Sequence, residues 1–164
     1  MAKEFTFRQS FDADPFAVFA MLRDREYVQA KCEATGSLET TVEVHEESDD
    51  STTIVSTRVL PADVPSVARK FVGETITATE TQEWSPAATD GSRTASVRVD
   101  FSGPLAFSGT LLLIPSGEGS QVVTEGVFTA SVPFVGGTIE SVASEQTSRY
   151  LSAEEKLARE WHRD

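Results

Sequence analysis

The sequence contains a single cysteine, Cys32, and no long apolar segment. A lone cysteine excludes an intrachain disulfide, and we interpret it as a small structural thiol. No apolar run approaches the roughly 20 residues that a membrane-spanning helix needs. The first residues lack the apolar core and the cleavage pattern of a secretion signal, so we expect a cytoplasmic protein that does not insert into a membrane.

Residue types and motifs typical of catalytic and metal sites are also scarce. Histidine occurs only as His45 and His162, and neither belongs to an HExxH pattern. The sequence has no CxxC, GxSxG, GxGxxG or P-loop motif. We therefore predict no metal site and no cofactor, and we assign no catalytic residue.

Positive charge is in short supply. The chain has 14 lysines and arginines against 26 aspartates and glutamates, which gives a formal net charge of −12. Such a surface repels nucleic acid and anionic lipid headgroups, so we expect neither as a partner. The length of 164 residues suits a single domain, residues 1–164, with a core large enough to enclose a cavity.

What the sequence has in abundance is alternation of apolar and polar residues, the period that predicts half-buried strands. Short polar turns join most of these segments, which favours an antiparallel sheet that twists and curls. The predicted strands cover residues 3–11, 38–46, 52–60, 75–84, 92–101, 105–114 and 121–132.

Three short helices are expected among the strands. Asp14 and Pro15 are typical of a helix start, and we place Phe16 on the buried face of the helix that follows. A second helix is expected over residues 24–32. A third is expected over residues 65–73, where a proline opens the segment and a glycine closes it.

The C-terminal segment predicts one long amphipathic helix from Thr138 to His162, about 37 Å long at ~1.5 Å per residue. Glu140 falls off the apolar stripe of this helix and is expected to face water. Laid in the concave face of the curved sheet, the helix completes an α+β fold. The stripe recurs at steps of three and four residues and comprises Val135, Ile139, Val142, Gln146, Tyr150, Ala153, Leu157 and Trp161.

The order of elements resembles the START-like superfamily, also called the SRPBCC or helix-grip fold. The junction from Val132 to Glu140, VPFVGGTIE, carries most of this resemblance, with support from residues 16–22, 69–73 and 81–84. The chain is most similar to a bacterial START-like family of unknown function. The resemblance implies a cavity between the sheet and the long helix that holds a lipid, a sterol, a polyketide or another small apolar ligand.

One segment departs from a branch of that superfamily. Birch-pollen-allergen-like members carry a glycine-rich loop between the second and third strands. The corresponding turn here, Glu46 to Asp50, is acidic and has no glycine. Carboxylates repel phosphate, so this turn is not expected to bind a phosphate group.

The predicted cavity is lined by the inward faces of the strands and by the helix stripe. Polar residues on these apolar faces are informative, because burying one without a partner costs roughly 1–3 kcal/mol. We predict that Gln146, Glu80 and Gln82 orient a hydroxyl or amide of the ligand; alternatively they pair with one another or face outward. The apolar candidates either contact a ligand or simply fill the core. The predicted cavity residues are Phe71, Glu80, Gln82, Trp84, Val99, Phe107, Phe128, Ile139, Val142 and Gln146.

The leading functional hypothesis is non-catalytic binding or carriage of a small hydrophobic ligand. The first alternative is an enzyme such as a polyketide cyclase or aromatase, in which Glu80 is the candidate base. The second is an interaction or assembly module without a ligand, which a filled core and an exposed apolar patch would favour.

Overall fold

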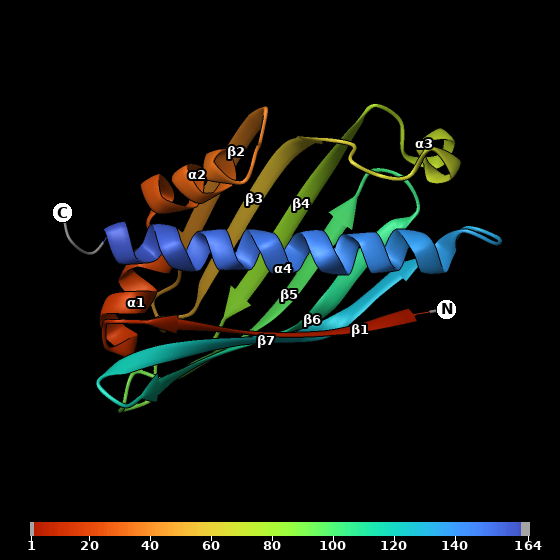
Figure 1. Ribbon diagram of the computed structural model, residues 1–164. Coiled ribbons are helices and arrows are strands. Elements are labelled where there is room, and N and C mark those ends of the chain that lie inside the picture. The colour runs from red at the N-terminus through yellow and green to blue at the C-terminus, as the bar shows by residue number, and fades with distance from the viewer. Residues whose placement is uncertain (1, 162–164) are drawn as a thin grey trace.

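A curved seven-stranded sheet wraps around one long helix in the computed structural model, which describes residues 2–161 (Figure 1). All neighbouring strands pair antiparallel in the order β1-β7-β6-β5-β4-β3-β2. The predicted α+β helix-grip architecture is therefore confirmed. The strands are β1 (Ala2–Phe11), β2 (Glu39–Glu46), β3 (Thr52–Pro61), β4 (Thr75–Trp84), β5 (Arg93–Phe101), β6 (Leu105–Ser116) and β7 (Gly119–Ala130).

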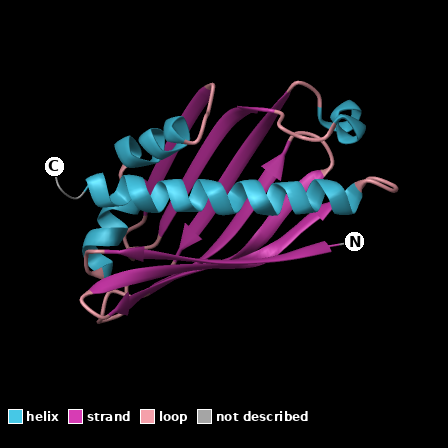
Figure 2. Ribbon diagram, in the orientation of Figure 1, coloured by secondary structure: helices cyan, strands magenta, loops and turns pink. Residues whose placement is uncertain are grey.

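The helices occupy the concave side of the sheet and its ends. The helix α4 crosses the concave face, α1 and α2 lie at its C-terminal end, and α3 lies near the opposite end of the sheet (Figures 1 and 2). The predicted last residue of the long helix, His162, lies outside the described residues. The helices are α1 (Pro15–Leu22), α2 (Arg25–Ala34), α3 (Ser66–Val72) and α4 (Gly136–Trp161).

Local hydrogen bonds explain where the short helices begin and end. The Asp14 Oδ1 atom accepts a hydrogen bond from the Ala17 N–H at 2.9 Å, and the Asp24 Oδ1 atom accepts one from the Glu26 N–H at 2.9 Å. Each carboxylate satisfies a backbone donor that has no partner within its own helix. Gly73 ends α3 with a φ of 80°, a conformation that side chains disfavour.

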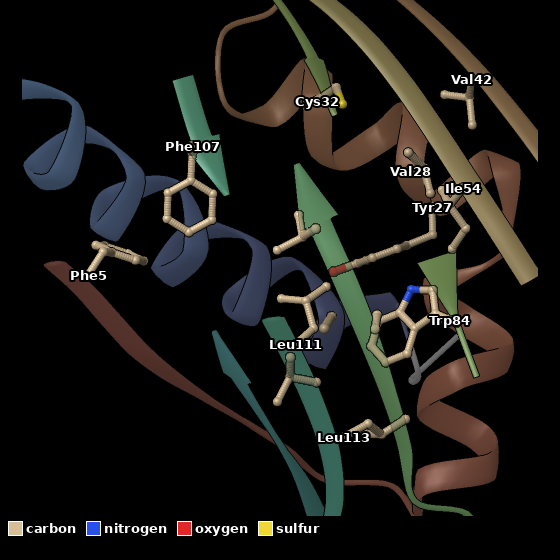
Figure 3. Close-up of a cluster of buried hydrophobic side chains, with 14 of the residues drawn as sticks. Phe5, Tyr27, Val28, Cys32, Val42, Ile54, Trp84, Phe107, Leu111 and Leu113 are labelled. Atoms are coloured by element: carbon tan, nitrogen blue, oxygen red, sulfur yellow. The ribbon is translucent and has the colours of Figure 1, made fainter. Parts of the chain in front are cut away.

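Aromatic rings fill much of the core between the sheet and α4. The ring centroids of Phe107 and Phe128 are 4.7 Å apart, and those of Phe5 and Phe128 are 5.5 Å apart with the rings nearly perpendicular. Trp84 meets Phe19 of α1 at 5.3 Å. Such tilted and edge-on pairs are favourable arrangements for buried rings. Figure 3 shows side chains of this cluster between the strands and helices.

The face that α4 turns toward the sheet includes residues of the predicted stripe, such as Ile139, Leu157 and Trp161, but it also includes one residue predicted to lie off the stripe. Glu140, expected to face water, is only 2% exposed. Its Oε2 atom accepts a hydrogen bond from the Ala130 N–H at 2.9 Å, so the carboxylate satisfies the backbone where β7 ends. Small residues on the same face let the helix axis approach the sheet. The buried residues of α4 are Gly136, Ile139, Glu140, Ala143, Glu154 and Ala158.

The prediction for Phe16 was wrong, because this side chain is 55% exposed. The helix α1 turns Val18 and Phe19 toward the core instead. Phe16 covers the loop between β4 and β5, where a Cβ atom placed on Gly91 would lie 3.0 Å from its ring. The helical period correctly placed an aromatic face here but did not show which of its residues meets the sheet.

The acidic β2–β3 turn has a structural role. The Arg93 Nη2 atom lies 2.9 Å from Asp50 Oδ2, and the Nη1 atom donates to the Asp50 and Ser85 carbonyl oxygens at 3.0 Å each. Arg93 is 8% exposed, and its guanidinium stacks 3.8 Å from the ring centroid of Phe19. A backbone hydrogen bond from Ala87 and the bond from Arg93 lower the pKa of Asp50. Arg93 therefore joins the β2–β3 turn to the β4–β5 loop and to α1.

The two glycines at the start of α4 provide a matched test of its close approach to the sheet. A Cβ atom on Gly136 would lie 2.8 Å from the Ala130 carbonyl oxygen, whereas one on Gly137 would have no neighbour within 4 Å. We expect Gly136→Ala to lower the free energy of unfolding by about 1–3 kcal/mol through overpacking. Gly137→Ala should leave it unchanged or raise it by up to about 1 kcal/mol. Denaturant titration measures both, and equal effects would contradict the close approach.

Candidate ligand-binding cavity

A cavity of about 90 Å³ lies between the concave face of the sheet and α4, at the end where α2 covers it. The helix α2 contributes Tyr27, Val28 and Lys31, and α4 contributes Tyr150 and Glu154 among others. The wall formed by the strands is mostly apolar, so the cavity has one apolar side and one polar end. The apolar wall includes Trp84, Val97, Val99, Phe107, Leu111 and Phe128.

A second cavity of about 40 Å³ continues along α4 toward its N-terminus. Phe101, Thr147 and Tyr150 line both cavities, so the two are neighbours. Together they approach the about 150 Å³ at which an engineered apolar cavity holds benzene. They are smaller than the roughly 300–1,000 Å³ of pockets that hold drug-sized ligands.

The structure places nine of the ten predicted site residues in these two cavities. Phe71 is the exception: it lines neither cavity and is 39% exposed on α3. Contact of any of these residues with a ligand stays a prediction. Glu80, Gln82, Trp84, Val99, Phe107 and Phe128 line the larger cavity, and Ile139, Val142 and Gln146 line the smaller one.

The three predicted residues of β4 form a hydrogen-bonded chain along the cavity wall. The Trp84 Nε1–H donates to Gln82 Oε1 at 2.9 Å, and Gln82 Nε2 donates to Glu80 Oε2. Alternation along the strand brings all three to the inward face. The sequence left open whether Glu80 and Gln82 pair with each other or face outward. In the structure they pair with each other inside the fold.

Sequence reasoning missed an ion pair at the polar end of the larger cavity. Lys31 Nζ lies 3.9 Å from Glu154 Oε1, and the two side chains are only 14% and 9% exposed. The Tyr27 hydroxyl donates to the Glu154 carbonyl oxygen at 3.2 Å. Figure 3 shows Tyr27 extending from α2 into the layer between helix and sheet. These contacts join α2 to the last third of α4.

Arg58 of β3 adds a second, half-buried cation to this end. Its Nη1 atom donates to Thr35 Oγ1 at 3.2 Å, and its guanidinium carbon lies 5.4 Å from the ring centroid of Tyr150. Burial alone would lower the pKa of Arg58, but attraction from Glu80 and Glu154 raises it overall. Arg58 therefore carries its positive charge inside the fold.

The electrostatic surroundings of Lys31 keep it charged as well. Burial by itself would lower the pKa of Lys31, but attraction from Glu154 and then from Glu80 raises it above its ordinary value. An ammonium group donates hydrogen bonds and has no lone pair for nucleophilic attack. Lys31 therefore presents a charged ammonium group, which has donors only, at the cavity.

Local spacing carried a signal for these missed residues. Arg58 follows Ile54 and Ser56 at alternate positions of one strand, which places it on the inward face. Lys31 lies four residues after Tyr27, one helical turn away on the same face. Both residues were missed because charged side chains usually face water.

The comparison with family models decides the family. The model described as "Protein of unknown function (DUF2505)" matches residues 6–161. The chain belongs to the DUF2505 family. The match covers every helix and strand of this DUF2505 chain except the first four residues of β1. No curated protein matches the sequence.

Solved structures share the fold at low sequence identity. TTHA0849 from Thermus thermophilus has a TM-score of 0.66 at 19% identity, covering 95% of this chain and 97% of that one. The Zhui aromatase/cyclase from Streptomyces sp. R1128 has a TM-score of 0.65 at 14% identity, with coverage of 96% and 94%. A STAR-related lipid transfer protein from Xanthomonas axonopodis has a TM-score of 0.62 at 19% identity, with coverage of 98% and 86%. The predicted START-like architecture is confirmed at the level of the fold.

Two further findings concern only the part of the chain that the structure describes. Within residues 2–161, no helix has the length and apolar character needed to cross a bilayer. The same residues contain no group of three or more histidine, cysteine, aspartate or glutamate side chains placed to hold a metal ion.

The ionisation of Tyr27 tests how well the polar end is shielded from solvent. Burial raises the pKa of Tyr27, with a further increase from Glu154 that attraction by Lys31 partly offsets. In a Tyr150→Phe variant, Tyr27 is the only remaining tyrosine of the two in the chain. We expect its tyrosinate absorbance at pH 11 to stay below half of its final value while circular dichroism shows a folded protein. In denaturant the midpoint should lie near pH ~10.

The raised pKa of Tyr27 makes the stability of the folded protein depend on pH. The folded protein keeps the Tyr27 proton at pH values where the unfolded chain loses it. The contribution of Tyr27 to stability is therefore complete below about pH 10 and is lost as the pH rises through the folded-state pKa. A folded-state midpoint near the ordinary tyrosine value would show that the polar end is open to water.

Gln146 has a contact that sequence reasoning did not anticipate. Its Nε2 atom donates to the Asp63 carbonyl oxygen at 2.7 Å, which ties α4 to the loop before α3. We expect Gln146→Leu to speed amide hydrogen exchange in residues 61–74 several-fold. The free energy of unfolding should fall by no more than about 1 kcal/mol, because this hydrogen bond is exposed. Glu145→Gln, at the exposed neighbouring position, is the control. Unchanged exchange in the Gln146 variant would show that the contact does not hold the loop.

Proposed function

We propose that this chain binds a small molecule with an apolar body and a hydrogen-bonding end, non-covalently, between the sheet and α4. The observation that carries the proposal is the larger cavity itself. Apolar side chains of β4–β7 form its wall, and charged side chains of α2, β3, β4 and α4 meet at one end. Ligand sites commonly combine an apolar lining with a few polar groups that fix orientation.

The volume of the cavity favours a small ligand. A single aromatic ring or a short alkyl chain suits a cavity of about 90 Å³ that adjoins a second one of about 40 Å³. A sterol or a two-chain lipid is much larger than this space. Burying about 200 Å² of apolar surface at ~25 cal/mol per Å² gives roughly 5 kcal/mol before ordering costs. Affinities for single-ring probes should therefore lie in the millimolar range or somewhat tighter.

The structural neighbours support ligand binding in general terms. One is named as an aromatase/cyclase and another as a lipid transfer protein. Both names refer to reactions or carriage of molecules with large apolar parts. The cavity also supports ligand binding over an interaction module with a filled core.

A cavity-filling substitution tests the proposal. Val99 lines the larger cavity, so Val99→Phe should occupy its apolar part. Val55 alternates with the cavity-lining residues Ile54 and Ser56 and therefore faces the opposite side of the sheet, which makes Val55→Phe a matched control. The probe is benzyl alcohol, followed by amide chemical shifts in a two-dimensional NMR titration.

We expect benzyl alcohol to shift amides of residues around the cavity in the wild-type protein and in the Val55 variant. The Val99 variant should weaken binding at least fivefold while both variants remain folded by circular dichroism. Binding that is equal in all three proteins, or absent from the wild-type protein, would contradict the proposed function. Native mass spectrometry of the purified protein offers an independent search for a ligand that co-purifies.

A further inference from the structure

The positive and negative charges around the larger cavity are equal in number, which indicates what kind of polar group a ligand can place there. Among the cavity-lining residues that the structure describes, the charged side chains are Lys31, Arg58, Glu80 and Glu154. Two cations and two carboxylates give the polar end no net charge. They come from α2, β3, β4 and α4, so this balance is assembled by the fold and is not visible in any single segment.

We infer that the ligand's polar end is an uncharged hydroxyl group, which accepts a hydrogen bond from Lys31 and donates one to Glu154. This inference rests on the proposed function and names the chemistry of the ligand's polar end. Lys31 and Glu154 offer complementary groups to the same space: the ammonium has donors only, and the carboxylate has acceptors only. A hydroxyl is the smallest group that satisfies both at once.

The distances suit a bridging group. Lys31 Nζ and Glu154 Oε1 are 3.9 Å apart, which is beyond the usual hydrogen-bond length of about 2.7–3.2 Å. An oxygen atom about 2.8 Å from each of them can lie between the two. Within residues 2–161, the ion pairs with atoms at 4.0 Å or less include neither Arg58 nor Glu80. Apart from the loosely spaced Lys31–Glu154 pair, the charges are therefore arranged around the cavity without direct ion-pair contact.

An ionised ligand end would disturb this balance. A carboxylate would attract Lys31 and Arg58 but would be repelled by Glu80 and Glu154, and an ammonium would meet the reverse pattern. Either ion would lose its hydration and leave the buried cluster with a net charge, which is costly in a low-dielectric interior. An uncharged hydroxyl avoids both costs and keeps its hydrogen bonds.

Four probes of one size separate the alternatives at pH 7: toluene, benzyl alcohol, benzoate and benzylammonium. We expect benzyl alcohol to bind at least tenfold tighter than either ion and at least threefold tighter than toluene, by NMR titration. Benzoate or benzylammonium binding as tightly as the alcohol would overturn the inference and leave the proposed function standing. Toluene binding as tightly as the alcohol would also overturn it. Binding of none of the four would refute the proposed function itself.

Variants that remove one charge from the cluster test whether its charge balance selects the ligand. Glu154→Gln leaves the cluster with one excess positive charge, so the affinity ratio of benzoate to benzyl alcohol should rise at least tenfold. Lys31→Met should raise the ratio of benzylammonium to benzyl alcohol in the same way. Glu160→Gln, an exposed position on the same helix, changes the total charge by the same amount as Glu154→Gln and should leave both ratios unchanged.

A variant of the second carboxylate, Glu80, provides the same test if Glu154→Gln does not fold. Glu80→Gln keeps a hydrogen-bonding partner for Gln82 and also adds one net positive charge, so it should shift selectivity toward benzoate as Glu154→Gln does. Ratios that stay within twofold of the wild-type protein in the folded variants would show that cluster charge does not select the ligand.

Discussion

The contact between α4 and the concave sheet determines how much space the fold encloses. Gly136 and Ala143 let the helix approach the strands closely, and the Glu140 carboxylate satisfies the backbone at the end of β7. A helix with large residues at these positions would stand off from the sheet and widen the gap between them. The approach is close near the N-terminus of α4, where the neighbouring cavity is small, about 40 Å³.

The other end of the same helix adds buried charge to its apolar packing. Glu154 lies buried on the face of α4 that meets α2, where it pairs with Lys31 and where its carbonyl oxygen accepts from Tyr27. Burying these charges is costly, and their mutual attraction offsets part of that cost. The same charges leave donors and acceptors directed at the larger cavity. Stability and candidate function therefore use the same side chains.

The sequence predicted the architecture well because strand and helix periods are local signals. Its seven strands and four helices appear in the described residues in the expected order. Asp14 and Gly73 marked helix boundaries correctly, since capping depends on neighbouring residues only. Most predicted cavity residues also face the cavities, because alternation along a strand fixes the face on which each side chain lies.

The polar end could not be predicted from local patterns in the same way. Lys31 and Glu154 are more than a hundred positions apart, and the opposite charge of each stabilises the other inside the fold. Glu140 is buried for a comparable reason, since its partner is a backbone N–H in the preceding strand. Phe16 shows the opposite error: an aromatic residue at a core-like position covers a loop instead. Whether each of these side chains is buried depends on contacts with residues that are distant in the sequence.

A crystal structure of the protein soaked with benzyl alcohol would test the central claim most directly. We expect the ring to lie against Val99 and Phe107, with the hydroxyl oxygen within hydrogen-bonding distance of both Lys31 Nζ and the Glu154 carboxylate. Electron density for the ring on the outer face of the sheet, or inside the cavity with the hydroxyl directed away from these two residues, would contradict it.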